Sequence, residues 1–265
     1  MAAMSAVMIF TGIGITPDRY ILVLILASLF IGKTRSFLMD WLPFIFILIA
    51  YDFLRSLVPF LNPRVHFQEM INFDQAVFGT NPTLFLQHTF FHPGQINLLD
   101  YFSIMFYFLH FALPLAFGFI LWIKNRNFFK RFSRALLILS YSAFATFVIF
   151  PAAPPWLAAR DGYLEGVVKI VDIVLKSFPD KLHLPSIYHN FNPNSVAALP
   201  SLHAAYPLLV LFFAIKVFGK KGWWFIFYVL GCWFSLVYLG EHYIADIVLG
   251  IVYATLALLF SKFLI

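Results

Sequence analysis

Six apolar runs, each close to the length needed to cross a bilayer, constrain this chain more than any other feature of its sequence. They cover about residues 37–58, 101–123, 134–151, 201–218, 223–240 and 243–263, and a shorter run covers about 20–32. A transmembrane helix needs about 20 predominantly apolar residues. Because 62% of the residues are hydrophobic and only 11% are charged, a water-soluble globule could not bury this much apolar surface. The sequence therefore predicts an all-α, polytopic transmembrane helical bundle with six core spans, and a seventh N-terminal span if the 20–32 run also crosses.

Two long segments between the predicted spans, at about 59–100 and 152–200, carry helix signals of their own. Charged residues recur at helical spacing through 165–178 with apolar residues between them, which predicts an amphipathic helix in the membrane interface. Asn81 followed by Pro82 is typical of a helix start. We expect one integral membrane domain over 1–265, with its core at about 37–263 and these segments forming an interfacial cap on the outer face.

The basic residues lie mainly in loops on one side of the predicted spans. If the spans alternate, this side carries a net charge of about +10 and the other side about −4. The positive-inside rule then places the basic side in the cytoplasm and both long segments on the extracytoplasmic or lumenal side. Because the overall charge of +6 is explained by insertion, we expect no nucleic-acid partner. The single cysteine, Cys232, excludes an intrachain disulfide.

Ionisable residues at the outer ends of the spans are candidates for function, because charge at membrane depth is costly. His203 lies at the start of the 201–218 span, and His242 lies just before the last span. The chain between them runs inward and returns over similar lengths, so both histidines should reach a similar depth. His242 and Asp246 are four residues apart, which in a helix would bring the carboxylate beside the imidazole. There it would orient the ring, as the acid of a catalytic triad does.

Together these residues predict a phosphoryl-transfer site. One imidazole would attack phosphorus, and the other would protonate the departing oxygen. Ser201 suits a helix N-cap, and the N–H groups at such helix starts favour an anion, so we expect them to hold phosphate oxygens. Three other interpretations remain open from the residues alone: histidines that only pack and form hydrogen bonds, a metal site with His203, His242 and Asp246 as ligands, and a proton or ion path.

These motifs resemble those of the type 2 phosphatidic acid phosphatase superfamily. The second motif of that family is P-S-x-H, matched by Pro200, Ser201 and His203, and its third ends in H-x-x-x-D, matched by His242 and Asp246. The resemblance implies a bundle of about six helices. It also implies that His242 is the nucleophile that forms a phosphohistidine, that Asp246 orients it, and that His203 is general acid and then base. No metal and no cofactor are implied.

Longer strings are similar to the branch that contains inositol phosphorylceramide synthases and related headgroup transferases. They lie at residues 51–55, 78–83, 153–156, 194–203 and 240–246. The resemblance implies a membrane phospholipid donor, a lipid alcohol acceptor such as ceramide, and transfer of a phosphoryl headgroup of the inositol phosphate type. The alternatives are a lipid phosphate phosphatase acting on phosphatidate or a polyprenyl phosphate or diphosphate, and, in another class, a transporter or channel.

The chain departs from the superfamily pattern in its cations. The first motif, a Lys and an Arg-Pro pair separated by six residues, has no match near 150–162, and Leu236 stands where an Arg usually precedes the third-motif histidine. Arg55, on one helical face with Asp52, and Arg160 are the nearest candidates to bind the substrate phosphate. With fewer cations, the site should favour a phosphodiester with one charge over a terminal phosphate.

Overall fold

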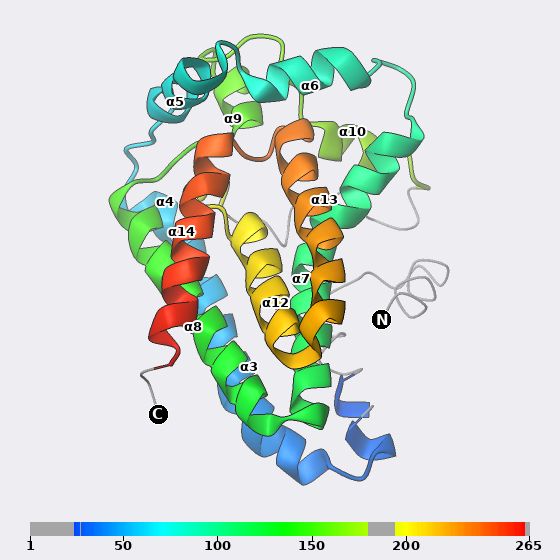
Figure 1. The fold of residues 1–265 in the computed structure, drawn as a ribbon. Helices are drawn as coiled ribbons and strands as arrows, with labels where there is room; N and C mark the ends of the chain where they lie inside the picture. Colours follow the sequence, from blue (N-terminus) through cyan, green and yellow to red (C-terminus); the bar gives the residue numbers. More distant parts are fainter. Residues whose placement is uncertain (1–23, 27, 180–193, 263–265) are drawn as a thin grey trace.

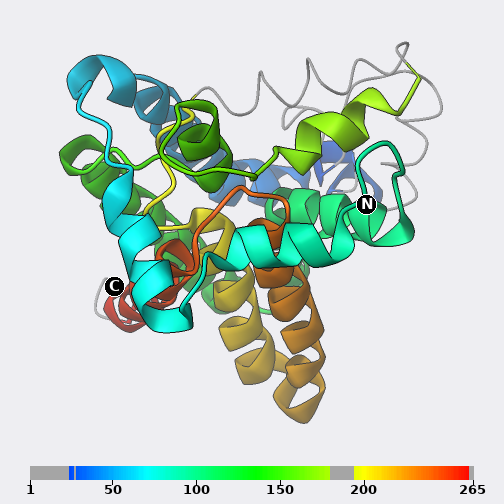
Figure 2. The same cartoon turned by 90° about the horizontal axis from the view of Figure 1, so that it is seen from above.

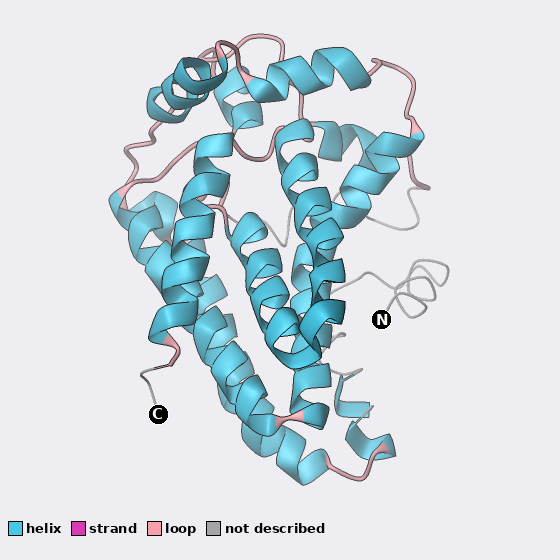
Figure 3. Cartoon of the chain, viewed as in Figure 1, coloured by secondary structure: helices cyan, strands magenta, loops and turns pink. Residues whose placement is uncertain are grey.

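The computed structural model describes residues 24–26, 28–179 and 194–262, and this part of the chain forms helices, with isolated bridges but no strands. Within this described part, six long helices run along the molecule (Figure 1). They are α3 (Thr34–Ser56), α7 (Leu98–Lys124), α8 (Arg126–Ile149), α12 (Leu202–Phe218), α13 (Phe225–Tyr238) and α14 (Ile244–Phe260). Each corresponds to one of the six apolar runs in the sequence, which confirms the predicted all-α bundle (Figure 3).

Four stretches of the described chain are long and apolar enough to cross a membrane: Thr34–Ser56, Leu98–Lys124, Arg126–Ile149 and Leu202–Tyr238. The last stretch is a hairpin, in which the 3-10 helix η2 (Gly219–Trp224) turns α12 back into α13. Helix α14 is apolar but shorter, with 17 residues. The chain is therefore an integral membrane protein, whereas six as the number of spans stays a prediction. The predicted run at 20–32 falls partly outside the described residues.

Aromatic side chains fill the core between α3, α7 and α8. Trp41 is fully buried and stacks on Phe37 and Phe129, with ring centroids 5.2 and 4.8 Å away. Beside this cluster, Asp40 accepts hydrogen bonds from Trp122 Nε1 at 2.8 Å and from Arg126 Nη2 at 2.7 Å. These contacts join the three helices at the end of the bundle that carries the basic loops.

Close packing between α12 and α14 fixes the opposite end. A Cβ atom on Gly250 would lie 2.6 Å from the carbonyl oxygen of Ser201, so only glycine lets α14 pack this closely against the start of α12. The backbone N–H of Ser201 also donates to the carbonyl oxygen of Asp246 at 3.0 Å. The two motif segments that begin these helices are thereby held side by side.

Short helices cover the end of the bundle at which α14 begins (Figures 1 and 2). They are α5 (Gln68–Phe78), α6 (Pro82–Phe90), α9 (Pro155–Arg160) and α10 (Ile170–Lys176), while α4 (Val58–Leu61) continues α3. The predicted start of α6 is confirmed, because the Asn81 side chain accepts a hydrogen bond from the N–H of Leu84 at 3.2 Å.

The amphipathic helix predicted over 165–178 is shorter than expected. Only Ile170–Lys176 is helical, and the apolar side of α10 is buried next to α7. Gly162 and Gly166 have φ angles of +83° and +78°, which a right-handed helix cannot contain. These glycines keep the preceding stretch in turns, so the helix starts only after them.

Candidate active site

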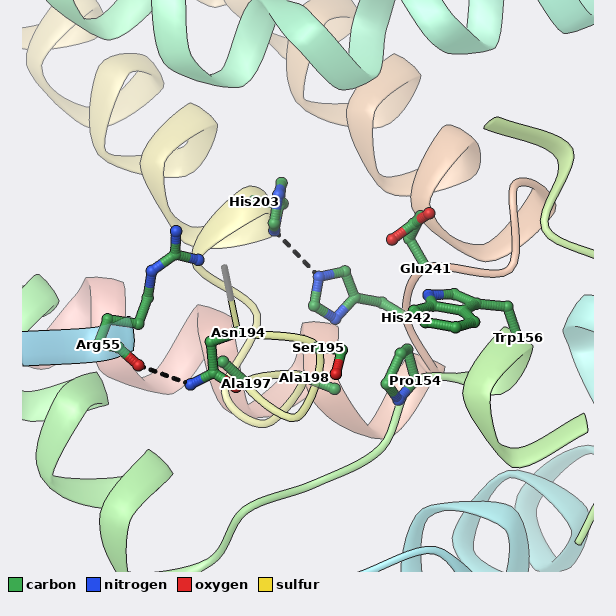
Figure 4. Close-up of a pocket in the computed structure, with 10 residues that line it drawn as sticks. All are labelled: Arg55, Pro154, Trp156, Asn194, Ser195, Ala197, Ala198, His203, Glu241 and His242. Atoms are coloured by element: carbon green, nitrogen blue, oxygen red, sulfur yellow. Dashed lines mark hydrogen bonds between the residues drawn. The ribbon is translucent and has the colours of Figure 1, made fainter. Parts of the chain in front are cut away.

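The predicted catalytic residues come together where the segments leading into α12 and α14 meet, and Figure 4 shows two of them, His203 and His242. His203 lies in the first turn of α12, His242 in the loop between α13 and α14, and Asp246 in the first turn of α14. His242 Nδ1 is 3.2 Å from Asp246 Oδ2, and His242 Nε2 is 3.1 Å from His203 Nδ1. The three side chains therefore form one chain of hydrogen bonds. The spacing predicted the carboxylate beside the imidazole and the similar depth of the two histidines, but not their direct contact.

The loop that carries His242 is fixed by two carboxylates from different parts of the chain. Asp246 Oδ2 also accepts from the backbone N–H of Tyr243 at 3.0 Å. Asp74, a fully buried residue of α5, accepts from the N–H of Ile244 at 3.0 Å and from that of Ala245 at 3.1 Å. Because Tyr243 at the N-cap offers no carboxylate or amide oxygen of its own, Asp74 supplies the cap of α14 from another helix.

The environment of Asp74 raises the pKa of its carboxyl group above the ordinary value. Burial and the charge of Asp246 raise the pKa of the Asp74 carboxyl to about 6, against the two N–H donors, which lower it. These contacts also bear on the prediction that N–H groups at helix starts bind phosphate oxygens. The first N–H groups of α14 already have carboxylate acceptors, so they do not offer the open anion site that the sequence predicted.

Neither Ser201 nor Arg160 lines the pocket that contains the histidines, although the Arg160 guanidinium lies 5.9 Å from the ring centroid of Trp156, which does line it. Ser201 is fully buried, and its Oγ accepts a hydrogen bond from the N–H of Ala204 at 3.2 Å, so it caps α12 as predicted. The side chain of Arg160 is 64% exposed and forms an ion pair with Asp161 at 2.7 Å. Of the side chains predicted to bind phosphate, only Arg55 lines the pocket.

The pocket itself combines one cation, one acid and small or aromatic side chains. It is lined by Arg55, Pro154, Trp156, Asn194, Ser195, Ala197, Ala198, His203, Glu241 and His242. Arg55 is buried, and its Nη2 donates to Asp52 Oδ1 at 2.9 Å. The Asn194 side chain donates to the carbonyl oxygen of Arg55 at 2.9 Å, which ties the segment before α12 to the end of α3. Figure 4 shows the Arg55 guanidinium on the side of the pocket where His203 lies.

A third histidine, which the motifs did not identify, contacts His203. His110 of α7 is buried, and its ring centroid is 3.9 Å from that of His203. Tyr107, one turn earlier, stacks on His203 with centroids 5.1 Å apart and an interplanar angle of 16°. Nδ1–H of His110 donates a short hydrogen bond to the carbonyl oxygen of Tyr107. An imidazole within an apolar span was the available sequence signal, because such groups are costly in a membrane.

Lys169 is a cation next to the pocket, and the sequence analysis did not predict it as a site residue. Its Nζ lies 4.1 Å from the centroid of the Trp156 ring, which lines the pocket, and 3.5 Å from Asp172 Oδ1. Among the described residues, no three His, Cys, Asp or Glu side chains form a group that could hold a metal ion. This geometry therefore provides no ligand group that supports the interpretation as a metal site.

Comparison with known proteins gives consistent matches. The family model described as the PAP2 superfamily matches residues 68–260, which include His203, His242 and Asp246. A phosphoinositol dihydroceramide synthase of Bacteroides thetaiotaomicron is 32% identical over 95% of this chain and 86% of its own length. No solved structure matches the chain.

Two yeast proteins match over a smaller share of their length. They are inositol phosphorylceramide synthase catalytic subunits of Schizosaccharomyces pombe and Saccharomyces cerevisiae, which are 27% and 30% identical to this chain. The matches cover 76% and 43% of this chain, and 48% and 30% of the yeast proteins. The chain thus spans about half of the first yeast relative and less of the second.

Proposed function

This chain belongs to the PAP2 superfamily, and we propose that it is a lipid phosphotransferase that moves an inositol phosphate headgroup from a phospholipid to a ceramide-type lipid alcohol. The observation that carries the catalytic part of this proposal is the hydrogen-bonded chain from Asp246 through His242 to His203. The choice of donor and acceptor is supported by the names of the similar synthases.

In the first half-reaction, His242 forms a bond to phosphorus. When Nδ1–H of His242 donates to Asp246, Nε2 carries the lone pair, and this nitrogen faces His203. Nε2 attacks the phosphorus of the donor, and the bond from phosphorus to the diacylglycerol oxygen breaks. His203 gives its proton to that oxygen, so diacylglycerol leaves as a neutral alcohol. Asp246 stabilises the positive charge that develops on the His242 ring.

In the second half-reaction, the acceptor alcohol reverses these roles. Its hydroxyl gives a proton to His203, and its oxygen attacks phosphorus while the bond to His242 Nε2 breaks. The headgroup phosphate is then attached to the acceptor, and both histidines return to their starting states. If water took the acceptor's place, the same residues would act as a phosphatase, which is the nearest alternative.

The charges around the pocket favour a phosphodiester donor. Arg55 is the one cation among the residues that line the pocket, while Lys169 and Arg160 lie outside the lining, next to the Trp156 ring. A phosphodiester carries one negative charge, which one guanidinium can match with charge-assisted hydrogen bonds. A phosphate monoester dianion would need more positive charge, and the acidic Glu241 in the same pocket would oppose it.

We infer that the site faces the extracytoplasmic or lumenal side. His203 and His242 lie at the starts of α12 and α14, and these helix starts point toward the end of the bundle that the short helices cover (Figure 1). The basic loops around Lys33, Arg126 and Lys220 lie at the opposite ends of the long helices. Positive charge near the ends of spans favours the cytoplasm, so the active site would act on the opposite leaflet.

A transfer assay with purified protein tests the proposed function. Phosphatidylinositol labelled in its headgroup should give labelled inositol phosphorylceramide when ceramide is present, and the inositol phosphate should be trapped on His242 when it is absent. His242→Ala should abolish transfer, whereas His88→Ala, at an exposed position in α6, should not. Phosphate release from phosphatidate without headgroup transfer would show a phosphatase. Unchanged lipid turnover in His242→Ala would favour a transporter or a structural role.

A further inference from the structure

A second cavity lies between α5 and α14, and its lining is almost entirely apolar. Its volume is about 290 Å³, and it is lined by Glu69, Met70, Phe73, Leu199, Ala245, Val248, Leu249 and Val252. We propose that this α5–α14 groove binds the hydrocarbon chain of the neutral lipid alcohol acceptor. The proposal rests on the proposed function, because it assigns a site to one of the two lipids in that reaction.

The groove has fixed walls, because a buried residue joins the two helices that form it. Asp74, one residue after Phe73 in α5, accepts hydrogen bonds from the N–H groups of Ile244 and Ala245 at the start of α14. Asp74 is fully buried, and Met70 of the groove wall is 2% exposed. A binding site for an apolar ligand is usually preformed in this way.

Two chain segments that line the active-site pocket continue into the lining of the groove. Leu199 lines the groove, and the preceding residue, Ala198, lines the pocket of His203 and His242. Ala245 also lines the groove, and it is followed directly by Asp246, which binds His242. A lipid chain in the groove would therefore lie against the same two segments that position the catalytic groups, with its polar end directed toward them.

The charge of the groove selects between the two lipids. Glu69 is its one charged residue, and the hydrogen bond from His66 Nδ1 at 2.6 Å lowers the pKa of the Glu69 carboxyl, so it stays ionised. A carboxylate repels the phosphate of an anionic phospholipid, but it accepts hydrogen bonds from the hydroxyl and amide groups of a neutral lipid. The cation that suits the phosphate, Arg55, lines the other pocket.

The groove opens to the outside of the bundle, where apolar residues of its lining are exposed. Val248 and Val252 of α14 are each 45% exposed, and Phe73 of α5 is 42% exposed. A hydrophobic acceptor could enter sideways from the bilayer without passing through water. The donor headgroup and the acceptor chain would then approach the histidines from different sides, as a reaction with two lipid substrates requires.

The first experiment measures binding without turnover. The His242→Ala protein, which cannot transfer the headgroup, is placed in nanodiscs made without phosphatidylinositol and irradiated with a ceramide that carries a photoreactive group in its chain. We expect crosslinks to peptides from α5 and α14, and competition by unlabelled ceramide but not by phosphatidylinositol. Equal competition by both lipids would show that the groove holds bulk lipid and would overturn the proposal.

Matched tryptophan variants then test the groove in the transfer reaction. Val252→Trp fills the groove, while Leu256→Trp adds the same side chain on α14 at a position that is similarly exposed, 44%, but outside the groove. Val252→Trp should reduce crosslinking and raise KM for a long-chain ceramide about tenfold, with less effect on a short-chain one. Leu256→Trp should change neither value. An equal effect on both ceramides, or an effect on the KM of the donor instead, would contradict the proposal.

Charge reversal at the groove provides a separate readout. Glu69→Lys should let phosphatidylinositol compete for crosslinking, because the new ammonium group attracts the phosphate. No change in competition would show that Glu69 does not select the lipid. A wild-type protein that crosslinks ceramide in the groove but transfers no headgroup would refute the proposed function and leave the site itself supported.

Discussion

Asp246 and His242 meet as the H-x-x-x-D spacing predicts, but they do so through a different local structure. The sequence argument placed both residues within one helix, whereas α14 begins at Ile244, so His242 lies in the loop before it. Asp246 Oδ2 accepts hydrogen bonds from both the His242 ring and the N–H of Tyr243. These two bonds hold the loop against the start of α14. The motif therefore specifies a capped helix start as well as a pair of side chains.

Removal of His203 tests its proposed role as the acid. His203→Ala should lower kcat for the natural donor by about 10² to 10⁴, because diacylglycerol is a poor leaving group without a proton. A donor with a nitrophenol leaving group needs little protonation and should lose much less activity. Single-turnover formation of the phosphohistidine with both donors would measure the difference. Equal losses for the two donors would contradict the acid role.

The two arginines predicted to bind phosphate should now behave differently. Arg55 is buried and lines the pocket, so Arg55→Ala should lower kcat/KM for the donor by about 10- to 100-fold, the cost of one charged hydrogen bond. Arg160 is exposed and paired with Asp161, so Arg160→Ala should stay within about twofold. Steady-state kinetics with phosphatidylinositol would decide this. A larger loss at Arg160 would mean that the phosphate binds elsewhere.

Whole helices could be predicted from the sequence when their signal was a long apolar run, but not when it was a short amphipathic pattern. The runs at 101–123 and 201–218 became α7 and α12 with ends within a few residues of those expected. The pattern at 165–178 became only α10, because periodicity describes which residues are apolar and not whether Gly166 adopts a positive φ.

The same limit applies to the site. Sequence spacing brings His203 and His242 together because one hairpin connects them, so their relation is local to that hairpin. The contacts of Asp74 with α14 and of His110 with His203 join helices that are far apart in the chain. Such contacts depend on how the helices pack, which a spacing argument within one segment does not contain.

The cap that α5 provides for α14 predicts a defect in stability and turnover. Asp74→Ala would leave two backbone N–H groups without their acceptor, at a cost of about 1–3 kcal/mol each. The melting temperature in detergent should fall by several degrees, and kcat should fall more than KM rises, because the His242 loop loses its support. Asp74→Asn keeps an oxygen acceptor and should restore part of both values. Equal behaviour of the two variants would contradict a capping role.

The raised pKa of Asp74 gives this cap a pH dependence with a definite sign. Its folded pKa of about 6 lies above the ordinary value of 3.8, so the folded protein binds a proton that the unfolded chain releases. That contribution to stability is complete below about pH 4 and is lost as pH rises to about 6. The melting temperature of the wild-type protein should therefore fall relative to that of Asp74→Asn across this range. Above about pH 6, the difference between the two melting temperatures should stay constant.

At the scale of the whole molecule, the two ends of the bundle differ in charge and in covering. One end has exposed basic loops, with Asp40 bound to Arg126, and the other has the interfacial helices over the pocket and the α5–α14 groove. The candidate active site and the proposed chain site thus both lie near one end of the bundle. A lipid phosphotransferase needs this arrangement, because its substrates keep their chains in the bilayer while their headgroups react.

This asymmetry predicts which end reacts with reagents outside the cell. Lys221→Cys, in the exposed turn after α12, should be labelled by a membrane-impermeant maleimide only after the membrane is disrupted, because basic loops stay in the cytoplasm. His88→Cys, exposed on α6 in the cap, should be labelled in intact bacterial cells that express the protein. The native Cys232 is buried and provides a single low background for both variants. Labelling with the opposite pattern would place the histidines at the cytoplasmic leaflet. The enzyme would then draw its donor lipid from that leaflet instead of the outer one.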